Sequence, residues 1–147
     1  MRRLRATFLL AVLMTLPGVG SARAADTGFV LIANTANPVS ELSADTVARL
    51  YLKKSRKWPN GFTVTPVDQS ATSPVRTAFT REVLGKTIGE MRDYWLKQTL
   101  SGADVPPVTR GGDVDVIRFV AEDAGAIAYV SAEAKLPADV KALRVVR

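Results

Sequence analysis

The sequence predicts an α/β fold, a single three-layer lobe with a mostly parallel sheet flanked by helices. Two observations support this prediction. Short apolar runs at residues 29–33 and 126–130 are typical of strands that are buried on both faces. Between them lie segments with helical spacing and recognisable helix caps. Strands that alternate with helices generally form a parallel sheet covered by helices.

The first strand is predicted at residues 29–33 (FVLIA), followed by a turn-rich loop. Ser43 is then placed to cap a helix that ends near Lys53. Leu42 and Val47 flank this cap at the spacing of a hydrophobic staple. The sequence therefore predicts a strand, a loop and an amphipathic helix in this order.

A basic loop follows this helix, with the sequence KKSRKWPNG at residues 53–61. A charge run beside Trp58 is typical of a solvated loop whose tryptophan packs at the edge of the core. Binding of phosphates or sugars is the alternative interpretation. After the Asn-Gly turn, alternating residues predict a strand at 62–67.

The next two helices have clear start and stop signals. Ser73 and Pro74 occupy the N-cap and first helical position, and Gly85 ends the helix. Val75, Phe79 and Val83 share one face of it. Thr87 and Glu90 form a capping box for a further helix that ends near Gly102. Its Met91, Tyr94 and Trp95 keep helical spacing and are interpreted as core rather than as a ligand platform.

The C-terminal third is predicted to contain a last helix and two strands. Asp113 is expected to cap the helix, and Gly125 is expected at its end as a left-handed cap. Strands follow at residues 126–130 and 143–146. One compact domain is expected over about Thr27 to Val146. Its predicted core consists of Val30, Ile32, Leu50, Phe79, Trp95, Ile117, Ile127 and Tyr129.

Residues 1–24 read as a secretory signal peptide, which leaves residues 25–147 as the mature domain. Arginines precede an apolar block at residues 8–16, and Ala22-Arg23-Ala24 matches the pattern that a signal peptidase reads. The apolar block is far shorter than the roughly 20 residues of a membrane-spanning helix. We therefore expect a soluble periplasmic protein without stable membrane insertion.

Composition narrows the possible functions of the mature chain. Removal of residues 1–24 takes away four arginines and no acids, so 20 − 4 = 16 basic residues face 14 acidic ones. This small excess, together with export, argues against nucleic acid as a partner. The chain contains no cysteine and no histidine, which removes thiol chemistry and the commonest general base. We therefore expect neither an enzyme nor a cofactor.

Acidic pairs give only a weak indication of metal binding. Asp113 with Asp115 fits the start of a helix, and Glu122 with Asp123 fits the end of one. We therefore predict no metal site.

The stretch PVDQSATSPVR, residues 66–76, is the candidate ligand site. Ser70, Thr72 and Ser73 place hydroxyl donors beside a helix N-terminus, where free N–H groups and the helix dipole favour an anion. Arg76 can add a bidentate charge. In the alternative interpretation, Ser73 only caps the helix and Arg76 is a solvated first-turn residue.

Four segments resemble the substrate-binding proteins of phosphate ABC transporters, and specifically small single-lobe members with a PBP-like domain. The segments are NPVSELSADTVARLYLKKSRKWPNG, VTPVDQSATSPVRTAF, YWLKQTLSG and EDAGAIAYV, and they occur in family order over nearly all of the mature chain. The resemblance implies one lobe of the periplasmic-binding-protein type. In full-length receptors of this family, a second lobe closes over the phosphate.

The resemblance also implies where a ligand binds. The family places an arginine and then a Ser-Gly-Thr motif against the phosphate. Ser73 falls on the family serine, while Gln69, Pro74 and Val75 stand at the arginine, glycine and threonine positions. Arg76 is a candidate replacement for the lost charge. The candidate oxyanion ligands are therefore Gln69, Ser70, Thr72, Ser73 and Arg76.

Two functional hypotheses follow. The first is an exported phosphate-receptor-like protein that binds a small oxyanion such as phosphate weakly and is accessory to transport or sensing. The alternative is a protein-interaction module that binds no small ligand and presents its open face to a protein partner or to a second copy. A hydrolase is a distant third, because a serine without histidine needs a lysine base and the mature chain contains no Ser-x-x-Lys pair.

Overall fold

The computed structural model describes residues 28–147, so the predicted signal peptide lies outside the described residues. The strands are β1 (Phe29–Asn34), β2 (Glu41–Ser43), β3 (Thr65–Gln69), β4 (Val108–Arg110), β5 (Ala126–Ser131) and β6 (Val140–Val146). The helices are α1 (Ala44–Tyr51), α2 (Pro74–Leu84), α3 (Ile88–Leu100) and α4 (Asp113–Glu122). This confirms the predicted α/β fold class.

The described strands form one mixed sheet with the order β2-β6-β1-β5-β3-β4. Strand β3 is parallel to β4 and β5, and β2 is parallel to β6. Strand β1 is antiparallel to both of its neighbours, β5 and β6. The sheet is therefore mostly parallel, as predicted, with β1 as the exception. An apolar run predicts burial on both faces but carries no information about strand direction.

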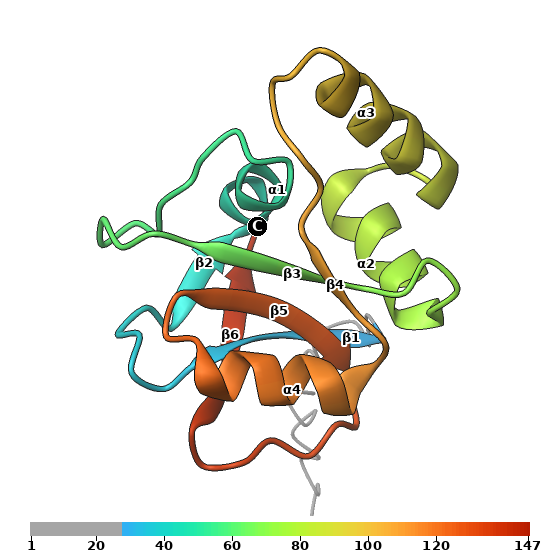
Figure 1. Ribbon diagram of the computed structural model, residues 1–147. Helices are drawn as coiled ribbons and strands as arrows, with labels where there is room; N and C mark the ends of the chain where they lie inside the picture. Colours follow the sequence, from blue (N-terminus) through green and yellow to red (C-terminus); the bar gives the residue numbers. More distant parts are fainter. Residues whose placement is uncertain (1–27) are drawn as a thin grey trace, which may run out of the picture.

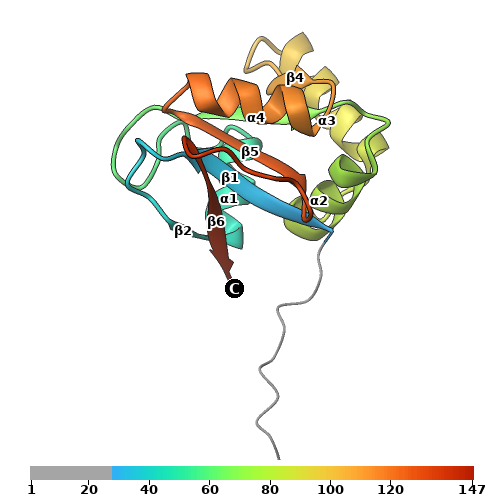
Figure 2. The same cartoon turned by 90° about the horizontal axis from the view of Figure 1, so that it is seen from below.

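Helices cover both faces of the sheet and make three layers (Figures 1 and 2). Leu31, Ile127 and Tyr129 pack on the side of α1 and α2. Ile32, Ala128 and Val130 pack on the side of α4. Because side chains alternate along a strand, β1 and β5 supply both cores. Six of the eight predicted core residues are buried, whereas Val30 and Ile117 are half-buried and their neighbours Leu31 and Val116 are fully buried.

The predicted caps of three helices are confirmed. Ser43 accepts a hydrogen bond from the Thr46 amide, and Thr87 and Glu90 make the capping box. Ser73 caps α2 and Pro74 is its first residue. Gly85 ends α2 with φ 62°, a left-handed conformation that costs glycine little.

Two predicted helix ends are wrong. Gly112, not Asp113, is the N-cap of α4, and it makes no side-chain cap. Asp113 is the first helical residue, and its carboxylate accepts instead from Gln69 and Ser131. Helix α4 ends at Glu122, and Gly125 is not left-handed. A Cβ at Gly125 would lie 2.7 Å from the Thr63 carbonyl oxygen, so the close approach of the backbone requires glycine there.

The region before β3 also differs from the prediction. The strand covers Thr65–Gln69 rather than residues 62–67, and Phe62 is 64% exposed in the preceding turn. The pattern also missed β2 and β4, which have three residues each. Strand β4 lies at one edge of the sheet and begins directly after Pro106-Pro107.

Helix α3 lies beyond α2, away from the sheet (Figure 1). Met91 and Trp95 are buried, as predicted, and the Tyr94 hydroxyl donates to the Leu52 carbonyl at 3.0 Å. None of the helices within residues 28–147 combines the length and the hydropathy that a bilayer crossing requires.

Candidate anion site

The candidate site lies where strand ends and helix starts meet. The parallel strands β3, β4 and β5 all end at the same edge of the sheet, and α2 and α4 begin there. The Ser70 amide donates to the Arg110 carbonyl at 3.0 Å, and the Asp113 carboxylate accepts from the Ser131 amide at 3.2 Å. In open α/β sheets, ligands bind outside the carboxyl ends of the strands, which makes this edge the first place to look for a site.

The start of α2 brings together the three predicted hydroxyl groups. Ser73 Oγ accepts from the Arg76 amide at 3.3 Å and donates to Gln69 Oε1 at 2.8 Å. The Ser70 and Thr72 hydroxyls lie 3.1 Å apart, and Thr72 is exposed. The amide of Val75, the second helical residue, has no intrahelical acceptor. This edge therefore offers hydroxyl groups and a helix N-terminus to solvent.

Gln69 faces the interior instead of the edge. Its side chain is buried, with Nε2 donating to Asp113 Oδ1 at 2.9 Å and to the Tyr129 carbonyl at 3.0 Å. Both amide hydrogens are thus used within the domain. Because Oε1 also accepts from Ser73, Gln69 links the starts of α2 and α4 and supports the edge from beneath.

Arg76 also turns back toward the domain. Its guanidinium pairs with Asp68 Oδ2 at 3.0 Å and donates to the Gln69 carbonyl at 2.8 Å. The side chain is 15% exposed, and Nε is buried without a hydrogen-bond partner. The positive charge expected at the site is therefore offset by an internal carboxylate.

Asp68 and Tyr129 form the buried part of the site. The Tyr129 hydroxyl donates to Asp68 Oδ1, and its ring stacks on Phe79 with centroids 4.0 Å apart. Burial raises the pKa of Asp68 above its usual value, although the Arg76 charge and the Tyr129 hydrogen bond act against this shift. Burial, followed by the charge of Asp68, raises the pKa of Tyr129. Tyr129 is therefore a neutral donor at physiological pH.

Sequence reasoning placed neither Asp68 nor Asp113 in the site. Tyr129 was predicted only as a core residue, because its apolar neighbours give no sign of the polar partner of its hydroxyl. The sequence does contain one usable signal for the site. Asp68 and Ser131 each come directly after a predicted strand. Polar residues at the ends of parallel strands share one edge.

Comparisons with known proteins detect the fold but no close relative. No protein-family model and no curated protein sequence matches this chain. Among solved structures, an ABC-type phosphate transport receptor from Vibrio cholerae matches 80% of this chain at 19% identity, with a TM-score of 0.61. The match covers 46% of the receptor.

Two further structures agree with this match. A structure from Clostridium perfringens, described as a phosphate ABC transporter substrate-binding protein with bound phosphate, has a TM-score of 0.64 at 23% identity and is covered over 44% of its length. PstS from Borrelia burgdorferi has a TM-score of 0.62 at 12% identity and is covered over 47%. Each match includes 80% of this chain.

These matches define the fold of the chain. It has the α/β fold of substrate-binding proteins of this type and spans just under half of the length of each. At 12–23% identity the likeness extends to the fold alone.

Proposed function

We propose that this chain is an exported, phosphate-receptor-like protein that binds a small oxyanion weakly at the start of α2 and is accessory to transport or sensing. The observation that carries the proposal is the convergence of Ser70, Thr72 and Ser73 at a helix N-terminus on the carboxyl edge of the sheet. Helix N-termini favour anions because their amides lack intrahelical acceptors. The phosphate bound in the Clostridium perfringens neighbour supports the choice of oxyanion.

The expected affinity is low, for two reasons found at the site. The Arg76 charge is already paired with Asp68, so a ligand gains little from it. Thr72 is exposed, and hydrogen bonds to an anion at such an edge compete with water. A dissociation constant of about 1 mM corresponds to about −4 kcal/mol, which a few hydrogen bonds supply after ordering costs.

The second candidate function is a protein-interaction module, and one observation favours it. Val114 follows Asp113 at the start of α4, on the same edge, and is 71% exposed. Val114 gives a protein partner that covers this edge one apolar contact beside the polar groups. In this interpretation, a protein partner or a second copy covers the edge and no small ligand binds.

The test is a titration of the exported protein with phosphate and sulfate, followed by NMR. The intact mass of protein recovered from the periplasm is measured first, and a chain that begins at Ala25 is expected. The amides of residues 70–77 should shift with a dissociation constant of about 1 mM. Thr72→Ala should weaken binding about fivefold, because it removes one hydrogen bond to a charged group. Ser73→Ala should weaken binding less, because the Ser73 hydroxyl donates its proton to Gln69 Oε1 and supports the site only by capping α2.

Ser101→Ala is the matched control, since Ser101 lies at the far end of α3 and binds only the Gln98 carbonyl through its hydroxyl. It should leave the titration unchanged. If no amide near residues 70–77 shifts, or if all three variants behave alike, oxyanion binding at this edge is wrong. Self-association, measured by sedimentation velocity, then becomes the first check of the interaction-module alternative.

A further inference from the structure

A second charged surface lies at the opposite end of β3. Residues 49–57 contain five lysines or arginines and no acid. Lys53 and Arg56 pair with Asp104, at 3.6 Å and 2.7 Å. Within residues 28–147, no carboxylate lies within ion-pair distance of the other three, Arg49, Lys54 and Lys57. We name these three cations together with Phe62 the basic loop surface.

Phe62 places a large apolar side chain beside these charges. It is 64% exposed and lies in the turn at residues 57–63, which projects from the start of β3 (Figure 1). A bridge between Lys57 and Thr63 closes this turn, and the Trp58 amide donates to the Phe62 carbonyl at 2.8 Å. Lys57 and the exposed aromatic residue therefore occupy neighbouring positions on this turn.

The turn is held in place by Trp58. Its side chain is 2% exposed, and Nε1 donates to the Gly125 carbonyl at 2.9 Å. Asn60 accepts from the Phe62 amide at 3.2 Å, which fixes the tip. A preorganised turn loses little conformational entropy when it binds, so its few contacts contribute more to affinity.

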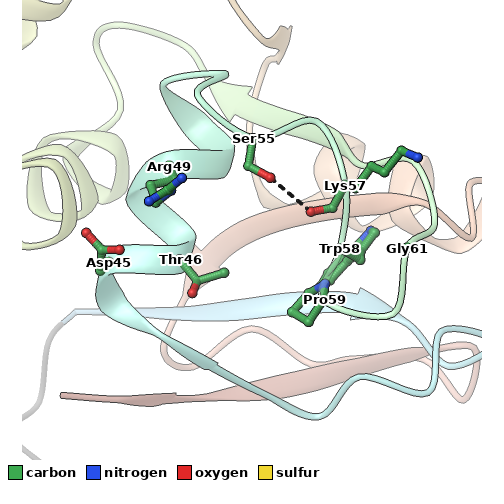
Figure 3. A pocket seen from close by; sticks show the side chains of 8 residues that line it. All are labelled: Asp45, Thr46, Arg49, Ser55, Lys57, Trp58, Pro59 and Gly61. Carbon is green, nitrogen blue, oxygen red and sulfur yellow. Dashed lines mark hydrogen bonds between the residues drawn. The ribbon is translucent and has the colours of Figure 1, made fainter.

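A hollow of about 390 Å³ lies between α1 and this loop (Figure 3). Asp45, Thr46 and Arg49 line it from α1, and Ser55 and Lys57 line it from the loop. Lys57 extends its side chain away from Arg49, so the two charges lie apart rather than at one point.

Asp45 is the single acid among the lining residues of this hollow. Neither Asp45 nor another carboxylate of residues 28–147 lies within ion-pair distance of Arg49, so its guanidinium is available to a phosphate group that enters the hollow.

We propose that the basic loop surface docks on a bilayer containing anionic phospholipid, with a headgroup phosphate near Arg49 and Phe62 at the interface. Membrane surfaces attract clustered lysines and arginines, and amphipathic surfaces add aromatic residues that enter the boundary with the acyl chains. An acidic peptide would match the cations but would leave Phe62 without an apolar environment. The turn at residues 57–63 projects from the domain, so it can reach a flat partner while a headgroup phosphate enters the hollow beside Arg49.

This proposal is independent of the proposed oxyanion site. The basic loop surface precedes β3 and the α2 edge follows it, so the two lie at opposite ends of the same strand. A chain docked through this loop keeps the start of α2 away from the bilayer. The two proposals can therefore fail separately.

The experiment is co-sedimentation of the exported protein with vesicles of phosphatidylglycerol and phosphatidylcholine, and with phosphatidylcholine alone. Binding should require phosphatidylglycerol and should fall sharply between about 50 and 300 mM salt. Lys54→Gln/Lys57→Gln should lower partitioning about 25-fold, since each cation near the surface contributes about a factor of five. Phe62→Ser should lower it about fivefold.

The matched controls carry the same changes elsewhere. Lys97→Gln/Lys135→Gln removes two exposed lysines, and Leu100→Ser removes an apolar side chain that is 79% exposed. Both controls should partition within about twofold of the parent. Thermal melts should show that all variants are folded. Absence of vesicle binding, equal losses in variants and controls, or binding to polyglutamate but not to vesicles would each overturn the proposal.

Discussion

The two ends of β3 use positive charge in different ways. After the strand, Arg76 is 15% exposed and its guanidinium pairs with the mostly buried Asp68. Before the strand, Lys54 and Lys57 are exposed and have no carboxylate partner within the described part of the chain. The sequence offered Arg76 as a candidate ligand-binding cation, with a solvated first-turn residue as the alternative, and favoured a solvated loop for the lysines. The availability of a cation is thus decided by its tertiary partners, which the local sequence does not contain.

The largest expected effect is at Trp58, which anchors the basic loop surface. Trp58→Ala should lower the free energy of unfolding by about 3–5 kcal/mol, because it leaves a cavity and removes one of the two hydrogen bonds that the Gly125 carbonyl accepts, the other coming from the Thr65 amide. Trp58→Phe should cost less, since it keeps most of the packing and loses only the indole donor. Urea unfolding of both variants measures this difference. Similar losses in the two variants would mean that the hydrogen bond, rather than the packing, holds the turn.

An intermediate effect on the free energy of unfolding should distinguish the mostly buried ion pair of Arg76 from the exposed ion pair of Arg56. Arg76→Gln leaves the mostly buried Asp68 without its charge partner and should cost about 2 kcal/mol. Arg56→Gln removes a cation that is 67% exposed from Asp104 and should cost about 0.5 kcal/mol or less. Chemical denaturation at one ionic strength compares them. Equal losses would contradict the contrast drawn between the two ends of the strand.

The smallest expected effect is the dependence of folding stability on pH that Asp68 causes. Burial raises the pKa of Asp68, so the folded chain retains this proton over a range where the unfolded chain has lost it. The stabilising contribution of this group is fully present below its unfolded value, about 4, and is lost as the pH rises through the folded value. As the pH rises from the unfolded to the folded pKa of Asp68, the parent should therefore lose stability relative to the Asp68→Asn variant. Denaturation curves of both proteins at several pH values test this, and a constant difference would show that Asp68 titrates normally.

Local signals in the sequence predicted much of the fold. Ser73, Pro74 and Gly85 delimit α2, and Thr87 with Glu90 starts α3, because these residues satisfy helix ends through neighbours in the chain. Features made by distant partners were missed. The direction of β1 and the short strands β2 and β4 depend on pairing across the sheet. Asp113 failed as a cap because Gln69 and Ser131 compete for its carboxylate.

In the candidate site, too, features set by neighbours in the chain could be predicted, and features set by distant partners could not. The pattern correctly indicated that Ser73 caps the start of α2 next to Ser70 and Thr72. It could not indicate that Gln69 points inward, because its partners Asp113 and Tyr129 lie 44 and 60 residues away in sequence. The pairing of Arg76 with Asp68 was within reach, since only eight residues separate them. It was missed because strand β3 had been expected to end at Val67.

Pro106 and Pro107, just before edge strand β4, have a consequence for solubility at high concentration. An exposed sheet edge offers free backbone groups on which other chains can add a strand, the first step of ordered aggregation. Here the edge strand has only three residues, and the two residues before it have no N–H to donate. An incoming strand would find too few partners to form a stable ladder. This side of the sheet is thereby protected against growth into fibrils without a covering helix.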